Sequence, residues 1–277
     1  MLTYEYIVLY NTNMNLANTH NIFYIFGIRF SMYGLIIAIG MLLGIFVGAK
    51  IAKKRGLKVE DIYLLALYAL PLSIIGARLY YVIFSSTSFT FKEIFEIWNG
   101  GMAIYGGVIG GCLGVVLYCL IHKKNFLKVA DICSVCLILG QAIGRIGCYF
   151  AGCCYGVEVV NPNAMWFPLS VEIDGIWHYS TFFYESFCNF IIFAILLYFI
   201  LKHNQKTGTI LCMYLACYGA VRCIIETFRG DSLYIGTVKV SQILSLLLIV
   251  VGIILLIVIN TKKKGKNSED NTHNKVN

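Results

Sequence analysis

Two arginines stand in apolar stretches of this sequence where a membrane span is expected. Arg145 lies within the glycine-rich run 140–156, and Arg222 is followed four residues later by Glu226. An arginine at membrane depth costs about 2.5 kcal/mol or more unless it faces a polar interior, so it indicates a functional anion or ion-pair site. Arg222 and Glu226 share one helical face and can form an ion pair that offsets the cost of burying both.

Arg78 and Glu185 add two ionisable residues at a similar predicted depth, and Arg229 continues the stripe formed by Arg222 and Glu226. Each arginine alone could extend its charge to the lipid headgroups, and the pair of Arg222 and Glu226 could simply hold a bundle together. Five ionisable residues from four spans, with arginines outnumbering acids, instead predict an anion site in the outer half of the membrane. A phospholipid headgroup is the anion that this location suits.

A second unusual segment, 98–111, has six glycines in fourteen residues. Non-helical backbone at membrane depth is tolerated where it lines a cavity or is buried in protein. We therefore expect a broken or re-entrant segment, with residues 99–107 presenting backbone N–H groups to an anion. Close helix packing is the alternative, and we favour it for the second half of the segment, where Gly107/Gly111 and Gly110/Gly114 have the spacing of packing motifs.

The eleven cysteines suggest less chemistry. Cys133 and Cys136 have no second pair nearby, so they do not predict a metal site. Cys148, Cys153 and Cys154 differ because they lie at the external end of a predicted span. They could form a disulfide in an oxidising exterior or remain free thiols in an anaerobic organism.

The elements that position these side chains are predicted to be transmembrane helices. The chain has 277 residues, of which 59% are hydrophobic and 13% charged, which is too apolar for an ordinary soluble domain. We expect an all-α polytopic membrane protein with one membrane domain, 1–261, an external segment at about 152–182, and a basic, disordered cytoplasmic tail, 262–277. The predicted spans are about 31–47, 62–84, 98–121, 130–151, 183–201, 208–228 and 240–260.

Basic residues give the orientation. They gather after the first, third, fifth and seventh spans, at 50–58, 122–128, 202–206 and 262–266, whereas the other connections are poor in lysine and arginine. Because cytoplasmic loops carry the excess of positive charge, the N-terminus is predicted outside and the C-terminus inside. The net charge of +8 is mostly this topology signal and does not indicate nucleic-acid binding. Residues 1–30 lack the pattern of a cleaved signal peptide, so we expect the first span to be retained.

Several short motifs, in order along the chain, resemble those of the prolipoprotein diacylglyceryl transferases. They are Tyr33-Gly34, Gly76-Ala77-Arg78, Gly100-Gly101-x-x-x-Tyr105-Gly106-Gly107-x-x-Gly110-Gly111, Ala130-Asp131, Gly144-Arg145-x-Gly147, Tyr184-Glu185 and Tyr218-Gly219-x-x-Arg222-x-x-x-Glu226-x-x-Arg229-x-Asp231.

The resemblance implies an enzyme of the bacterial plasma (inner) membrane. Such an enzyme moves diacylglyceryl from phosphatidylglycerol to the lipobox cysteine of a prolipoprotein signal peptide and releases glycerol phosphate. It would need no metal and no organic cofactor. The alternative is a non-catalytic or transport-type protein that binds an anionic lipid or solute in an arginine-lined cavity. The polar residues are expected only in the outer half of the membrane, and this favours the enzyme, because a transport route would need polar residues in the inner half as well.

By this resemblance and by the chemistry of the residues, we assign two sets of side chains. Arg145 and Arg222 would handle the phosphate, with Tyr105 and Glu226 as further catalytic residues. The predicted substrate-binding residues are Tyr33, Arg78, Gly101, Gly106, Gly107, Asp131, Gly144, Gly156, Glu185 and Arg229.

Three positions depart from the family pattern. The family usually has histidine where this chain has Tyr105, asparagine where it has Cys148, and an acidic residue where it has Cys153. A tyrosine, whose pKa is ordinarily near 10, is a poor general base at neutral pH but a good hydrogen-bond donor. Either the histidine of the family does not act by abstracting a proton, or this chain is a divergent member with altered activity.

Overall fold

A computed structural model describes residues 22–25, 28–85, 89–97, 100–202, 206–230, 234–235 and 238–273. In this part of the chain, seven helices are long and apolar enough to cross a membrane, which confirms the predicted all-α polytopic class. The helices are α2 (Met32–Ala52), α3 (Val59–Phe84), α5 (Ile104–Ile121), α6 (Phe126–Ala151), α7 (Thr181–Lys202), α8 (Thr209–Phe228) and α9 (Val240–His273).

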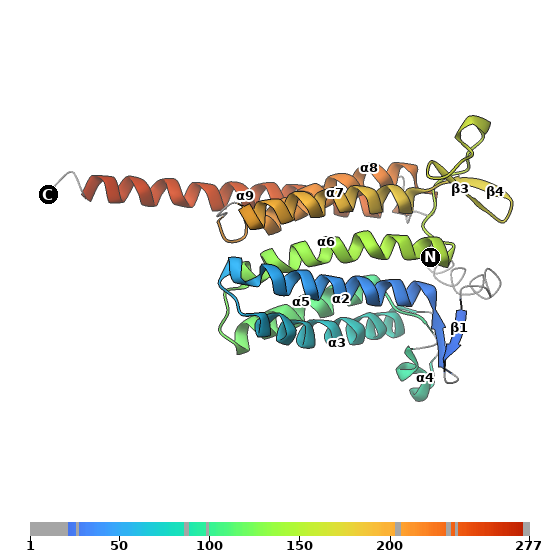
Figure 1. The fold of residues 1–277 in the computed structure, drawn as a ribbon, viewed down its shortest axis with the longest axis horizontal. Coiled ribbons are helices and arrows are strands. Elements are labelled where there is room, and N and C mark those ends of the chain that lie inside the picture. Colours follow the sequence, from blue (N-terminus) through green and yellow to red (C-terminus); the bar gives the residue numbers. More distant parts are fainter. Residues whose placement is uncertain are drawn as a thin grey trace.

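Helix α6 is the central element of the bundle (Figure 1). It packs against α2 on one side and against α7 and α8 on the other, while α3 pairs with α5 and α8 with α9. Its residues Ile132, Val135 and Ile138 are almost completely buried and lie in the main hydrophobic core. Because α6 contacts both halves of the bundle, a side chain near its end can reach partners from several helices.

The connections separate into two ends of the bundle (Figure 1). The links from α2 to α3, from α5 to α6 and from α7 to α8 lie at one end. The other end carries the short helix α4 (Phe91–Phe95) and the antiparallel pairs β1 (Ile22–Ile25) with β2 (Ile28–Ser31) and β3 (Ser170–Ile173) with β4 (Ile176–Tyr179). We call these the basic end and the hairpin end, since the lysine-rich loops lie at the first.

The glycine-rich segment differs in part from the prediction. Gly100 and Gly101 have positive φ angles of 85° and 72°, so the backbone before α5 is non-helical, as expected for a break. Helix α5, however, begins at Ile104 and continues without interruption to Ile121, so the third span starts later than predicted. Trp98 and Asn99 lie outside the described residues. The amide of Ala103 donates to the carbonyl of Ala77 at 3.0 Å and fixes the start of α5 against α3.

The close contact between α3 and α5 uses one of the two predicted glycine pairs, Gly110/Gly114, together with Gly106, but not the pair Gly107/Gly111. Gly106, Gly110 and Gly114 are buried and face α3, and a Cβ atom on Gly106 or Gly110 would clash with the backbone of Gly76 or Leu72. Gly107 and Gly111 lie beside the side chain of Ser73 with ordinary clearances. The spacing of four residues predicted that glycines of α5 pack against another helix. Which of the two adjacent rows of glycines faces α3 depends on how α5 is rotated about its axis.

Two ion pairs close the basic end. Arg55 lies 3.4 Å from the buried Asp131, and Lys124 lies 2.9 Å from Asp61, which also accepts a hydrogen bond from Tyr118. Ionisable residues are therefore not confined to the hairpin end, contrary to our expectation. These pairs join helix ends and their loops, where lysine and arginine can reach the headgroups.

The segment after α6 folds over the hairpin end, where an external segment was predicted. Gly152 ends α6 in the left-handed conformation, with φ of 59°. A short 3-10 helix (Pro162–Ala164) follows, and then the β3–β4 hairpin. The amide of Val157 donates to the carbonyl of Phe228 at 3.0 Å, so this segment is tied to the end of α8.

The last helix is longer than its span. The apolar part of α9 covers Val240–Ile259, and the helix continues to His273. The sequence predicts disorder from residue 262, whereas the structure extends the helix through this polar tail. Lysine and glutamate favour helix, and no proline interrupts the tail.

Candidate functional site

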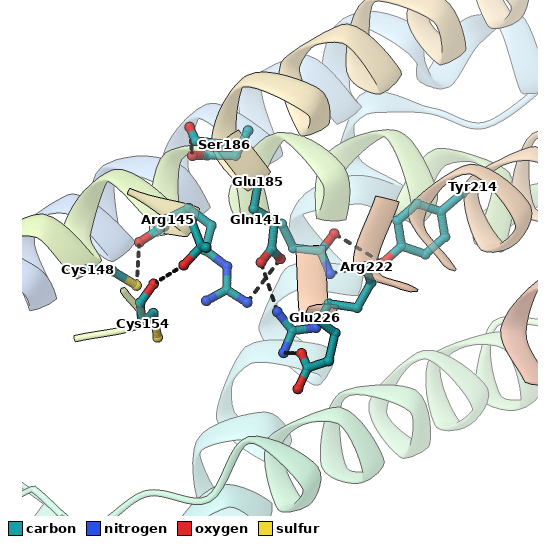
Figure 2. A network of polar contacts seen from close by, with 12 residues as sticks. Gln141, Arg145, Cys148, Cys154, Glu185, Ser186, Tyr214, Arg222 and Glu226 are labelled. Carbon is teal, nitrogen blue, oxygen red and sulfur yellow. Dashed lines mark hydrogen bonds and ion pairs between the residues drawn. The ribbon is translucent and has the colours of Figure 1, made fainter. Parts of the chain in front are cut away.

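Four charged side chains form a continuous chain of ion pairs across three helices (Figure 2). Arg145 on α6 lies 2.9 Å from one carboxylate oxygen of Glu185 on α7. The other oxygen of Glu185 lies 2.9 Å from Arg222 on α8. Arg222 in turn lies 2.9 Å from Glu226, four residues further along α8. The predicted pair of Arg222 and Glu226 is therefore present, and Glu185 joins it to Arg145.

The two glutamates of this network are more deeply buried than the two arginines. The side chains of Glu185 and Glu226 are 2% and 1% exposed, whereas those of Arg145 and Arg222 keep 19% and 16%. Within these four residues the charges balance, so the surplus of positive charge expected from the sequence is not present in the network itself. The buried carboxylates hold and orient the guanidinium groups, whose accessible edges remain available to an anion.

Hydrogen bonds between helices fix the elements that carry these side chains. Ser186, next to Glu185, donates to the carbonyl of Ala142 on α6 at 2.7 Å. Gln141 on α6 donates to the hydroxyl of Tyr214 on α8 at 3.0 Å. These contacts set the spacing of α6 from α7 and α8 beside Arg145, and sequence reasoning missed them. Their signal was weak, because serine and tyrosine are common in membrane helices and a single glutamine does not indicate its partner.

Space is left beside Arg145 on α6. A Cβ atom built on Gly140 or Gly144 would meet nothing within 4 Å outside its own helix. At Gly147, by contrast, a Cβ would lie 3.0 Å from the ring of Tyr33, so α2 approaches α6 closely at that level. The predicted residue Gly144 thus precedes Arg145 beside open space, and the predicted residue Tyr33 packs on the same helix at Gly147, two residues after Arg145.

The end of α8 is held by a residue that the sequence did not suggest. The ammonium group of Lys239 donates to the backbone carbonyls of Glu226 and Arg229 at 2.7 and 2.8 Å. A lysine at this position satisfies terminal carbonyl groups of the helix and complements its dipole. Arg229, a predicted binding residue, is the cap residue at which α8 ends.

Arg78 does not join this network by any contact in the described part of the chain. Its guanidinium donates to the backbone carbonyls of Glu93, Ile94, Gly100 and Gly101 at 2.6 to 3.0 Å. The residue is 7% exposed. It therefore fastens α4 and the segment before α5 to α3, and the predicted binding residue Gly101 contributes its carbonyl to that contact.

The first turn of α5 lies beside α3. Tyr105 is 42% exposed, and its ring centroid lies 6.3 Å from that of Tyr80. Gly106 packs on Gly76, and the carbonyl of Gly107 accepts a hydrogen bond from Ser73 at 2.8 Å. Within the described residues, none of these three predicted site residues contacts the arginine network directly.

Asp131 lies at the opposite end of α6 from Arg145. Their separation of fourteen positions in sequence corresponds to about 21 Å along a helix. Asp131 is fully buried and accepts hydrogen bonds from the amides of Gly208 at 2.9 Å and Leu211 at 3.0 Å. It caps the start of α8, which differs from the substrate contact predicted from the sequence.

Gly156 lies in the segment after α6, where the chain crosses the end of α8. Its amide donates to the carbonyl of Tyr179 at 2.7 Å, and it forms a bridge with Arg229. A Cβ atom there would lie 2.8 Å from the carbonyl oxygen of Phe228. A glycine is required for this close approach, so the structure gives Gly156 a packing role next to the site.

Three thiols gather at the end of α6. The sulfur atoms of Cys148, Cys153 and Cys154 lie within 4.8 Å of one another, and all three cysteines are free. Figure 2 shows Cys148 and Cys154 beside Arg145. Of the two states that the sequence left open, the structure contains the free thiols.

Known proteins are similar to this chain over most of its length. A family model described as prolipoprotein diacylglyceryl transferase matches residues 20–258. Proteins named phosphatidylglycerol–prolipoprotein diacylglyceryl transferase are similar to the chain. The one from Finegoldia magna is 40% identical over 83% of this chain and 91% of its own length. The one from Clostridioides difficile is 37% identical over 90% and 98%, and one from Streptococcus agalactiae is 40% identical over 82% and 90%.

Proposed function

Because the chain belongs to the prolipoprotein diacylglyceryl transferase family, we propose that it transfers diacylglyceryl from phosphatidylglycerol to a prolipoprotein thiol. The acceptor is the lipobox cysteine of the signal peptide, and the product is a thioether. The observation that carries the proposal is the placement of Arg145 and Arg222 on either side of one buried carboxylate, Glu185.

The reaction needs positive charge where the leaving group develops negative charge. The sulfur attacks the glyceryl carbon, the bond from that carbon to the phosphate oxygen breaks, and glycerol phosphate leaves with the proton of the thiol. Guanidinium groups held in fixed positions stabilise a phosphate without reorganising during the reaction. Arg145 and Arg222 have that fixed geometry, because Glu185 and Glu226 hold them from the buried side.

The two substrates also suit the location of the site. Both are lipid-anchored or membrane-inserted, and the arginine network lies near the hairpin end of the bundle, beside the segment folded over α6 and α8. The proposal places this end on the outer side of the bacterial plasma membrane, as the basic loops predict. Phosphatidylglycerol and the signal peptide would then approach from the lipid phase.

The proposal is tested with purified protein in detergent or nanodiscs. Phosphatidylglycerol and a synthetic lipobox peptide are incubated with the protein, and mass spectrometry detects the added diacylglyceryl group. A peptide with serine in place of the cysteine and a membrane with phosphatidylcholine as the sole lipid are the controls. We expect transfer with the cysteine peptide and phosphatidylglycerol together. A folded protein that binds the lipid but never modifies the peptide would support the non-catalytic alternative.

A further inference from the structure

The three thiols beside Arg145 are not used by the proposed reaction. Cys148 is buried in the last turns of α6, and Cys153 and Cys154 follow immediately, partly exposed, in the external segment. Cys148 and Cys153 are also two of the positions at which the chain departs from the family pattern. These residues therefore form a feature of this chain that its membership of the family leaves unexplained.

The backbone conformation of the turn after α6 brings the three sulfurs together. Gly152 reverses the chain at the end of α6, and the amide of Cys153 donates to the carbonyl of Cys148 at 3.1 Å. Cys154 has a φ of 61°, an uncommon conformation for a residue with a side chain. Its carbonyl accepts a hydrogen bond from Thr181 on α7 at 2.7 Å, which holds the turn against the bundle.

The separation of the sulfurs suits one small soft cation. Two thiolates on a tetrahedral zinc ion, each at about 2.3 Å, lie about 3.8 Å apart. The three sulfurs here lie within 4.8 Å of one another, so small side-chain rotations would bring them to that distance. A disulfide would join two of the three cysteines and leave the third as a free thiol, whereas a metal ion can be coordinated by all three sulfurs.

Charge also favours this occupant. Three thiolates and one Zn²⁺ ion carry a net charge of −1. Arg145 and Arg229 both interact electrostatically with Cys154, so cationic side chains face the cluster. An anionic metal–thiolate complex is stabilised by such neighbours.

We propose that Cys148, Cys153 and Cys154 form a binding site for a thiophilic divalent cation, Zn²⁺, at the end of α6 next to the arginine network. Binding releases the thiol protons to solvent and forms three zinc–sulfur bonds, with no change of oxidation state. The ion holds the turn that follows α6 and so positions Arg145 three residues before Cys148.

Three protein ligands leave one position of a tetrahedral zinc ion open, as in catalytic zinc sites. Such a position would lie beside the arginine network, and the second substrate of the proposed reaction is itself a thiol. The lipobox cysteine is therefore a suitable fourth ligand, and coordination would deprotonate it into the nucleophilic form. A role for the ion in the reaction would depart from the metal-free chemistry that the family resemblance implies. This extension rests on the proposed function, whereas the metal site does not.

The metal site is tested on the full-length protein purified without chelators. Elemental analysis should find about one zinc ion per chain, and Co²⁺ substituted for it should give the absorption of sulfur-to-cobalt charge transfer. In the variant with serine at all three positions, the zinc content should fall below roughly a tenth of that value. Cys112→Ser, which removes an exposed thiol from α5, is the matched control and should retain the metal.

Two outcomes overturn the metal site. One is a zinc content that the triple substitution leaves unchanged or that is absent in the wild type after exposure to Zn²⁺. The other is a disulfide among the three cysteines, seen as two thiols that resist alkylation before reduction. Since the triple variant could fail to fold, Cys154→Ser alone is measured too, and it should weaken zinc binding by about tenfold or more.

The extension to the substrate thiol has its own readout. Adding the lipobox peptide to the Co²⁺-loaded protein should change the cobalt spectrum, and the serine peptide should not. An unchanged spectrum would sink the thiol coordination while leaving the metal content as measured. If the wild-type protein binds the metal ion but transfers no diacylglyceryl group to the lipobox peptide, that result counts against the proposed function and not against the metal site.

Discussion

At the scale of single residues, the central finding is that Glu185 joins two arginines. Arg222 and Glu226 are close in sequence, but the contact of Glu185 with Arg145 and Arg222 joins three helices. A buried carboxylate between two guanidinium groups offsets their charge and fixes their orientation. The arginines are thereby kept in place before a phosphate arrives, which is the arrangement that electrostatic catalysis requires.

Replacing either arginine should remove most of the activity. We expect Arg145→Ala and Arg222→Ala each to lower kcat/KM by about 10²-fold or more, because each loses a fixed positive charge at the leaving group. Lysine should restore little, since it lacks the planar fork that contacts phosphate. The transfer assay measures the rates, and thermal unfolding checks the fold. Wild-type rates in both folded alanine variants would leave the arginines as structural residues.

The variant Glu185→Gln tests whether the carboxylate of Glu185 holds the two arginines in position. The amide keeps the size of the side chain but removes the negative charge that both arginines share. We expect kcat to fall by roughly 10–100-fold, because the guanidinium groups lose their fixed positions. KM for phosphatidylglycerol should not rise, since the site becomes more positive. Steady-state kinetics at varied lipid concentration gives both constants, and a raised KM with unchanged kcat would contradict this role.

Tyr105 is expected to donate a hydrogen bond and not to act as a base. Tyr105→Phe should lose at most about 1.5–3 kcal/mol of transition-state stabilisation, the range for a hydrogen bond to a charged group. Tyr105→His should be active, and the pH profile of the wild type should be little changed by the phenylalanine. Complete inactivation of Tyr105→Phe, together with a steep rise of the wild-type rate at alkaline pH, would show that the phenol must ionise.

At the scale of elements, the bundle depends on backbone contact between α3 and α5. Gly106 and Gly110 allow the two helices to touch, and this contact places the segment that Arg78 holds. Without a hydrophobic driving force between helices in lipid, such close packing is a main source of association. The glycines of this segment are therefore explained by helix packing in its second half, and by the turn at Gly100 and Gly101 in its first half.

Two adjacent glycines of α5 should tolerate alanine differently. Gly110→Ala places a Cβ against the backbone of Leu72 and should destabilise the protein by about 1–3 kcal/mol. Gly111→Ala is the control, because its Cβ would lie 3.7 Å from Ser73, an ordinary contact. Thermal unfolding in detergent should show a lower midpoint for Gly110→Ala alone. Equal midpoints would mean that α3 and α5 do not pack by this face.

At the scale of the whole molecule, charged residues are held in distinct ways at the two ends of the bundle. At the basic end, Asp131 and Asp61 tie loops and helix starts together. Towards the hairpin end, Glu185 and Glu226 hold arginines whose edges remain accessible. The ion pairs at the basic end join helix starts to loops, which is compatible with an enzyme that works from the hairpin end.

The orientation in the membrane is tested by labelling. A cysteine at Asp174, an exposed residue in the turn between β3 and β4, should react with an impermeant thiol reagent added outside intact cells. A cysteine at Lys54, exposed in the short 3-10 helix Lys53–Arg55 that follows α2, should not react until the membrane is opened. Both are made with the native thiols blocked or replaced. Labelling of the Lys54 position from outside would reverse the topology.

The sequence by itself determined the seven spans, their expected orientation and the pair of Arg222 and Glu226. These features follow from local quantities, namely apolar length, loop charge and a spacing of four residues on a helix. The predicted glycine break was found too, although it lies before α5 and not within it. Their depth in the predicted spans and the family motifs both predicted Arg145 and Glu185 as site residues, but not as partners.

Only the tertiary structure decided which partner each polar residue takes. Arg78 bonds to backbone carbonyls, Asp131 caps α8 about 21 Å from Arg145, and the thiols of Cys148 and its neighbours converge beside that arginine. Such pairings depend on the rotation and depth of each helix against its neighbours. Those are set by packing of residues far apart in the sequence, such as Gly76 with Gly106, so no single segment encodes them.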